Sequence, residues 1–125
     1  MAKRKTKISI TIPPYETPRN AWRRKIIEEV KKTNITYRPS DKLQLKVHLY
    51  FNKEALFSHD VDNRLKDIMD ALQGRIGGPK KIRPLAPIIP NDHQIFRATI
   101  EKSLPPKQSK GYGHLYITKY ISKDF

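Results

Sequence analysis

Hydrophobic side chains recur at every second position in two segments of the chain, which is the period of a strand with one buried face. The first segment runs from Ile8 to Ile12 and ends at Pro13-Pro14, where a strand stops for lack of backbone donors. The second runs from Leu43 to Phe51 and leaves its polar side chains on one wet face, as in antiparallel sheets. Residues 94–101 and 114–121 predict two further strands.

Two other segments have the period of an amphipathic helix. In the first, Trp22, Ile26 and Val30 recur every four residues after Thr17-Pro18, a pair typical of an N-cap and first helical position. The second extends from about Val61 to Gln73, and Gly74 follows it as a C-terminal stop. Its apolar residues form one stripe, which comprises Val61, Leu65, Ile68, Met69 and Leu72.

The order of these elements is β-α-β-α-β-β, which predicts an α+β fold. We expect a small mixed or antiparallel sheet of about four strands with the two main helices on one face. The 125 residues match a single domain, 1–125. Residues 1–7 form a basic N-terminal tail, and residues 75–91 form a long loop rich in glycine, proline and basic residues.

Charge narrows the range of functions. The chain has 26 basic and 12 acidic residues, a net charge of +14, which indicates a polyanionic partner, with nucleic acid ahead of a membrane surface. It has no cysteine, so thiolate metal sites, disulfides and cysteine nucleophiles are excluded. No apolar window is long enough to span a membrane and the N-terminus lacks the core of a secretory signal, so we expect a cytoplasmic protein. P-loop and dinucleotide-binding motifs are absent, so no organic cofactor is expected.

The acidic residues are clustered, whereas the basic residues are spread along the chain. Four of the 12, namely Asp60, Asp62, Asp67 and Asp70, fall within eleven consecutive residues, at the entrance of the second helix and along it. On that helix Asp62, Lys66 and Asp70 share one flank, Asp60 lies at the entrance, and Asp67 is expected to project toward solvent. Paired carboxylates repel each other unless a cation, a proton or the helix N-terminus compensates. A hard divalent cation at Asp60 and Asp62 would explain the cluster.

A purely structural interpretation is also open. Asp60 can be an N-cap, Asp62 can complement the helix dipole, and Lys66 can make an ordinary i,i+4 pair. His59 and His93 flank acidic residues, but a solvated loop histidine or a phosphate contact is favoured over a direct catalytic role.

The wider motif resembles the RusA family of Holliday-junction resolvases over roughly residues 8–121. The family signature reads D-x-D-N, a lysine four residues after the second Asp, D-A-L, and then D-x-Q-[I/V]. The matching positions are Asp60, Asp62, Asn63, Lys66, Asp70-Ala71-Leu72, Asp92, Gln94 and Ile95. Two features depart from the family: Asn91 precedes Asp92 where two acids are frequent, and the loop 75–90 is longer than usual.

The resemblance implies a homodimeric, magnesium-dependent endonuclease of DNA recombination and repair, encoded by a bacterium or a prophage. It nicks four-way DNA junctions symmetrically, and manganese can substitute for magnesium. The metal-binding and catalytic carboxylates map onto Asp60, Asp62 and Asp92, and the required lysine maps onto Lys66. We expect Asp92, at the start of a strand, to lie beside the entrance of the second helix.

The remaining candidates concern binding. Five basic residues are the best candidates for phosphate contacts, namely Arg23, Arg24, Lys80, Lys81 and Arg83. The apolar period assigns Trp22 to the core, and Phe96 is assigned to the core with Ala98 and Ile100. Two alternatives stay open: a non-catalytic nucleic-acid-binding module, for which the charge alone suffices, and a nuclease that acts on other branched DNA.

Overall fold

The computed structural model describes residues 5–75 and 87–122. Four strands and three α-helices follow one another in an α+β order, with a short 3₁₀ helix before the third strand. Their bounds are β1 (Ile8–Ile12), α1 (Arg19–Lys31), β2 (Leu43–Tyr50), α2 (Lys53–Leu56), α3 (Val61–Leu72), η1 (Asp92–Gln94), β3 (Ile95–Ser103) and β4 (Gly113–Lys119). All four predicted strands and both predicted helices are present, and the α+β fold class is confirmed.

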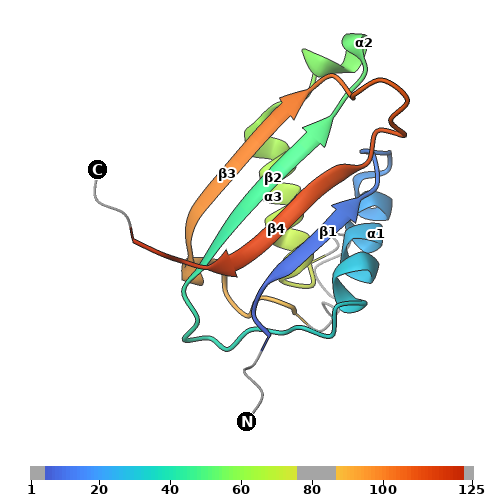
Figure 1. The fold of residues 1–125 in the computed structure, drawn as a ribbon. Helices are drawn as coiled ribbons and strands as arrows, with labels where there is room; N and C mark the ends of the chain where they lie inside the picture. Colours follow the sequence, from blue (N-terminus) through green and yellow to red (C-terminus); the bar gives the residue numbers. More distant parts are fainter. Residues whose placement is uncertain (1–4, 76–86, 123–125) are drawn as a thin grey trace.

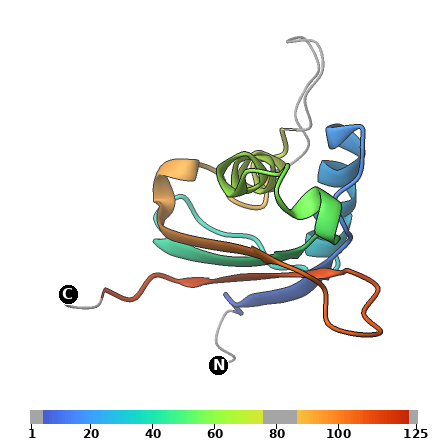
Figure 2. The same ribbon diagram turned by 90° about the horizontal axis from the view of Figure 1, so that it is seen from above.

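The strands form one mixed sheet in the order β1-β4-β2-β3 (Figure 1). β4 is antiparallel to both β1 and β2, whereas β2 and β3 are parallel and are connected through α3. The strand order leaves β1 and β3 at the two edges of the described sheet. The helices α1, α2 and α3 lie on one face of the sheet, and none of the described helices covers the other face (Figure 2).

The core lies between the sheet and the helices. Alternate residues of β2 point into it, and Leu43, Leu45 and Val47 are almost fully buried. Helix α1 contributes Trp22, which is fully buried as predicted and whose Nε1 donates a hydrogen bond to the Pro13 carbonyl over 2.8 Å. Within the described part of the chain, no helix combines the length and apolar character that crossing a membrane requires.

Several local features differ from the prediction. α1 begins at Arg19 with Pro18 at its N-cap, one residue later than expected. The single turn α2 was not predicted, and the Asn52 side chain caps it by accepting from the Ala55 N–H over 2.7 Å. At the end of α3, Gly74 has a φ of +81°, which confirms it as the C-terminal stop, because side chains disfavour that left-handed conformation.

Phe96 was assigned to the core, and that assignment is wrong. Leu43 pairs with Ile95 and Gln44 pairs with Arg97, so Phe96 has no partner and forms a bulge in β3. Its side chain is 52% exposed and packs beside Tyr120, with ring centroids 5.3 Å apart. The extra residue changes which side chains of β3 face the core after Phe96. The alternation of apolar residues in the sequence does not reveal such a bulge.

Candidate active site

Two acidic side chains stand free at the entrance of α3. Asp60 occupies the N-cap position and Asp62 lies in the first turn, and both residues are exposed. The Asp60 carboxylate makes no capping hydrogen bond and accepts only a 3.4 Å bond from Asn63 Nδ2. Across residues 5–75 and 87–122, Asp62 has no side-chain partner. The N-cap position of Asp60 is therefore as expected, but its carboxylate oxygens are not used for capping.

Lys66 lies one turn beyond Asp62 on the same helix and is exposed. No ion pair joins Lys66 to Asp62, or to any other acid in the described ranges. The structural interpretation, in which the lysine neutralises Asp62 through an i,i+4 pair, is thus not realised. The exposed side chains of Asp60, Asp62 and Lys66, at the N-cap and in the first half of α3, are therefore available to a ligand.

His59 directly precedes Asp60, and its ring packs against Phe51 and Tyr15. Its ring stacks on Phe51 at 4.4 Å between centroids and meets the edge of Tyr15 at 4.9 Å. Its Nδ1 accepts from Arg64 Nη1 over 3.3 Å, and its carbonyl accepts from Lys102 Nζ over 2.6 Å. Burial lowers the pKa of His59, and the nearby Arg64 and Lys102 charges lower it further. A neutral, stacked histidine fits a supporting role rather than catalysis.

The other two acids of the cluster are tied into an ion network between α1 and α3. Asp67 is fully buried, and its Oδ1 lies 2.7 Å from Arg23 Nη2 and 3.5 Å from Arg19 Nη1. Its Oδ2 lies 3.3 Å from Arg64 Nε, and Arg23 also reaches Asp70 at 3.4 Å. The expectation that Asp67 projects toward solvent is wrong. The expectation that Arg23 contacts phosphates conflicts with this arrangement, because its side chain is only 9% exposed and already paired.

Arg64 connects this network to the site entrance. Besides Asp67 and His59, its guanidinium lies over the Tyr15 ring, 4.1 Å from the centroid. The sequence pattern predicts a purely apolar buried face for this helix and assigns no role to Arg64, which lies between Asn63 and Leu65. The spacing of Arg64, Asp67, Ile68 and Ala71 does fit one helical face, and this signal was available.

Asp92 lies at the opposite end of the sheet from Asp60 and Asp62. It directly precedes β3, whose first residue Ile95 pairs with Leu43, whereas the entrance of α3 is reached only beyond the far end of β2. The length of β3 separates them, roughly 26 Å at about 3.3 Å per residue. The expectation that Asp92 lies beside the helix entrance is wrong. Within the described residues, no three acidic or histidine side chains form a group that could hold a metal ion.

The Asp92 segment is ordered by its neighbours in the motif. Asn91 and Gln94 cap η1 reciprocally, the Asn91 side chain accepting from the His93 N–H over 2.9 Å and the Gln94 side chain accepting from the Asn91 N–H over 3.0 Å. Gln94 is buried, and its Nε2 donates to the carbonyls of Arg38 and Asp41. This arrangement presents Asp92 at the surface with its side chain 45% exposed.

Four predicted phosphate contacts remain besides Arg23, and the structure describes only one of them. Arg24 is exposed on α1. Lys80, Lys81 and Arg83 lie outside the described residues. Lys102, to which the sequence assigned no role, is partly buried, and its Nζ donates to the carbonyls of Leu56 and His59.

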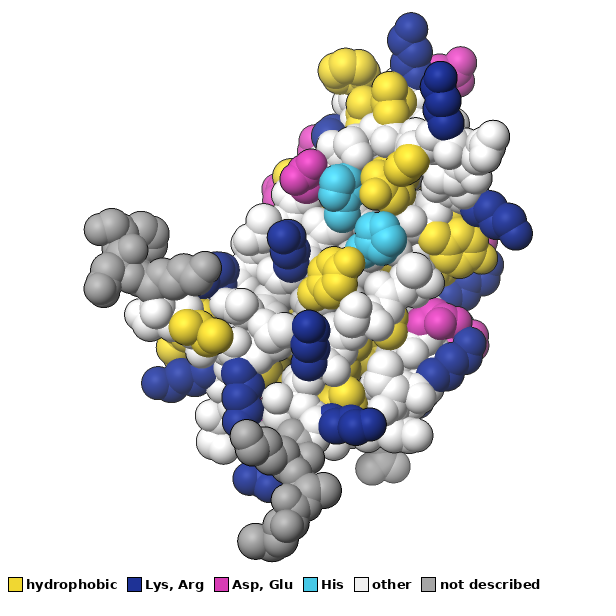
Figure 3. Space-filling view, in the orientation of Figure 1, with side chains coloured by type: hydrophobic (Ala, Val, Ile, Leu, Met, Phe, Trp, Pro, Cys, Tyr) yellow, Lys and Arg dark blue, Asp and Glu magenta, His cyan; other side chains and the backbone are white. Residues whose placement is uncertain are grey.

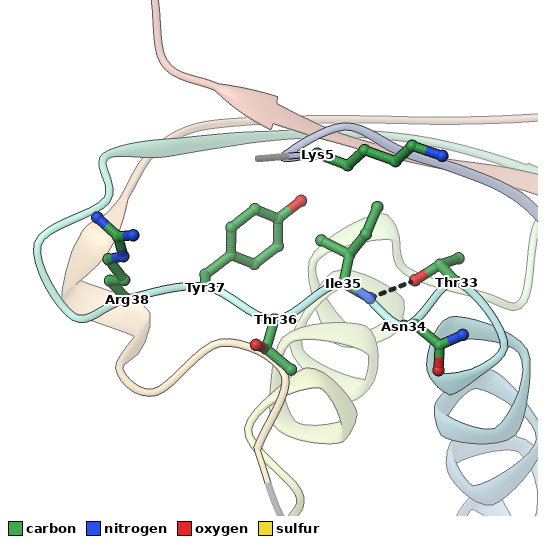
Figure 4. A pocket seen from close by; sticks show the side chains of 7 residues that line it. All are labelled: Lys5, Thr33, Asn34, Ile35, Thr36, Tyr37 and Arg38. Carbon is green, nitrogen blue, oxygen red and sulfur yellow. Dashed lines mark hydrogen bonds between the residues drawn. The ribbon is translucent and has the colours of Figure 1, made fainter. Parts of the chain in front are cut away.

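A pocket of about 510 Å³ is lined by Lys5 and residues 33–38, where α1 leads toward β2 (Figure 4). The Tyr37 side chain is buried there, and its hydroxyl donates to the Thr6 carbonyl over 2.6 Å. The lining contains no carboxylate, so this pocket offers no metal site and is separate from Asp60 and Asp62.

Comparison with models of known protein families and with curated proteins gives no match to this chain.

Proposed function

We propose that the protein is a magnesium-dependent, structure-selective endodeoxyribonuclease that nicks four-way DNA junctions as a homodimer in recombination and repair. The observation that carries the proposal is the exposed pair Asp60 and Asp62, which has no ionic partner among the described residues of a chain with a net charge of +14. The resemblance of the surrounding D-x-D-N and lysine motif to RusA resolvases supports the same reaction.

The donor set of this pair fits a hard divalent cation. Asp60 and Asp62 offer carboxylate oxygens, and magnesium typically takes one or two carboxylates while keeping waters and substrate phosphate oxygens. They would hold the ion at the positive end of α3, where the helix dipole already offsets part of their repulsion. A divalent cation bound there supplies a Lewis acid that activates water and neutralises charge on the phosphate. Lys66, on the same flank, would hold a non-bridging phosphate oxygen.

Asp92, the third carboxylate of the motif, can reach Asp60 and Asp62 only if it comes from a second copy of the chain. β3 is an edge strand and offers backbone donors and acceptors to another strand. If two β3 strands pair antiparallel around a two-fold axis, the start of each strand lies beside the end of the other. The partner's Asp92 then approaches Asp60 and Asp62, and the symmetry creates two equal sites. Two equal sites are what the paired nicking of a two-fold symmetric junction needs.

The first experiment tests the reaction. Purified protein is incubated with a synthetic four-way junction and with a linear duplex of the same sequence, each with magnesium and with EDTA. We expect magnesium-dependent, symmetrically placed nicks in the junction only. Cutting of flaps or replication forks in preference to the junction would keep the nuclease but change its substrate. Tight binding without nicking in magnesium or manganese would favour a non-catalytic nucleic-acid-binding module.

The second experiment tests how the site is assembled. Asp62→Asn and Asp92→Asn are each expected to be inactive, and the two inactive variants are then mixed and allowed to exchange subunits. If each site uses Asp62 of one chain and the partner's Asp92, the mixed dimer keeps one intact site and recovers single-strand nicking. If both residues act within one chain, every site in the mixture stays defective and no nicking returns.

A further inference from the structure

The sheet face that the helices leave open has a regular polar and aromatic surface. The strand register places on this face Gln44, Lys46, His48 and Tyr50 of β2, beside His114, Tyr116 and Thr118 of β4. The neighbouring positions are Arg97, Thr99 and Glu101 of β3 on one side, and Ser9 and Thr11 of β1 on the other. We call these residues, together with Lys7, the open face. Figure 3 views it directly and shows two histidines at its centre, with hydrophobic and basic side chains around them.

Rings line the middle of the open face. His48 packs on Tyr50 with 4.7 Å between centroids, and Tyr50 meets the edge of His114 at 5.9 Å. The ring of His114 lies nearly parallel to that of Tyr116, at 6.4 Å and 21°. Tyr116 is 37% exposed, so part of its ring is accessible to a ligand. Flat rings of this kind provide stacking surfaces for planar groups.

Basic and hydroxyl groups border these rings. A shallow cavity of about 570 Å³ on this face is lined by Lys7, Lys46 and Arg97, together with Thr99, Tyr116 and Thr118. Glu101 is the one acidic residue of the open face, and it lies 4.0 Å from His48 Nδ1. The face thus carries three permanent positive charges against one negative charge. Cations and hydroxyls beside exposed rings match the chemistry of a phosphate backbone that carries accessible bases.

We propose that the open face binds single-stranded DNA, with bases stacked on Tyr116 and phosphates held by Lys7 and Lys46. Only unpaired bases expose a ring surface to such a platform, whereas a duplex would offer the face phosphates alone. A second copy of the chain fits less well. Face-to-face contact would oppose the same three cations, and the open face has no large aliphatic side chain to bury. This inference does not depend on the metal site or on nuclease activity.

The test measures binding in EDTA, where no cleavage occurs. Fluorescence anisotropy compares a labelled fifteen-residue thymidine oligomer with an abasic oligomer of equal length, which has the phosphates but no bases. We expect the thymidine oligomer to bind more tightly. Tyr116→Ser should weaken its binding about tenfold and leave the abasic oligomer unaffected, because only the stacking is removed. Lys46→Ala and Lys7→Ala should each lower the slope of log affinity against log salt by about 0.7 for both oligomers.

Lys31→Ala is the charge-matched control, since Lys31 is exposed on α1, away from the open face. The proposal is overturned if Lys31→Ala lowers the salt slope as much as Lys46→Ala, or if Tyr116→Ser leaves the thymidine oligomer unaffected while circular dichroism shows a native fold. It is also overturned if Tyr116→Ser abolishes self-association in light scattering without changing affinity for DNA, since a second copy would then occupy the face. Loss of junction nicking in Asp62→Asn concerns the metal site alone.

Discussion

The two ends of the acidic cluster on α3 differ although they lie on one short helix. Asp67 is fully buried and is contacted by the guanidinium groups of Arg23, Arg64 and Arg19. Asp62, one and a half turns earlier, is exposed and has no counter-ion among the described residues. The same residue type on the same helix thus has three arginine partners at one position and, within the described residues, no ionic partner at the other.

The difference indicates which carboxylates can act on a ligand. A buried carboxylate surrounded by arginines is already compensated, and its removal leaves uncompensated cations in a region poor in water. An exposed, unpaired carboxylate contributes little to stability but keeps its oxygens available. We therefore assign Asp67 to the packing of α1 against α3, and Asp60 and Asp62 to binding. Arg64 links the two groups, since it contacts both Asp67 and His59.

The largest expected effect comes from removing the charge of the exposed carboxylate, Asp62. Asp62→Asn should lower single-turnover junction nicking about a thousandfold, because several kcal/mol of charge stabilisation by the cation would be lost. Junction affinity should stay equal or rise, because a negative charge near the phosphates is gone. The free energy of unfolding should change by less than about 0.5 kcal/mol. Nicking at the parental rate would show that Asp62 is not a metal ligand.

Replacing the buried carboxylate, Asp67, should mainly lower stability, whereas replacing Asp62 should mainly lower nicking. Asp67→Asn should lower the free energy of unfolding by about 3 kcal/mol, because Arg23 and Arg64 keep their charges in a buried position. Urea denaturation followed by circular dichroism measures this loss. As a matched control, Arg23→Met combined with Asp67→Leu removes the shortest ion pair of the network and should recover part of the stability, because Arg64 stays buried without its carboxylate. A loss below about 1 kcal/mol in Asp67→Asn would contradict the structural role.

Lys66 provides a second test of the exposed carboxylates, because it carries a positive charge one turn beyond Asp62 on the same flank of α3. Lys66→Ala should reduce nicking about a hundredfold, the typical effect of removing one group that stabilises transition-state charge. Junction affinity should fall less than about threefold. Single-turnover rates and equilibrium binding of the same variant separate these effects. Equal losses in rate and affinity would assign Lys66 to general phosphate binding.

The sequence predicted the elements better than it predicted which side chains they bury. Of the predicted apolar stripe of α3, Ile68 and Leu72 are fully buried, and Leu65 and Met69 are partly buried against the core. The buried face also includes Arg64, Asp67 and Ala71, which were not predicted to lie there. Hydrophobicity could not reveal the burial of Asp67, because this residue is compensated by Arg23, which lies 44 residues away in the chain. Such a pairing depends on how α1 packs against α3, and that packing is absent from any local pattern.

The error about Asp92 has a topological cause. The order of the four strands and the two main helices was predicted correctly, but that order does not state which strands are parallel. Because β2 and β3 are parallel, α3 begins at the carboxyl end of β2 and the chain returns to the amino end before β3 starts. Asp60 and Asp92 are therefore at opposite ends of the sheet, although the motif suggests one site. The sequence motif identifies Asp60, Asp62 and Asp92 as candidates, but whether they lie close together in one chain depends on the strand directions, which the motif does not contain.

The smallest expected effect distinguishes two neighbouring arginines of α1. Arg24 is exposed, whereas Arg23 is buried against Asp67. Arg24→Ala should leave the unfolding free energy unchanged, weaken junction binding about threefold, and lower the salt slope by about 0.9, as expected for one lost contact with a duplex phosphate. Arg23→Ala should instead destabilise the fold, because Asp67 stays buried with fewer counter-ions. Affinity measured across salt concentrations, with urea denaturation of both variants, provides the check. If Arg24→Ala leaves the salt slope unchanged, α1 does not face the junction, and the phosphate contacts must come from other basic residues.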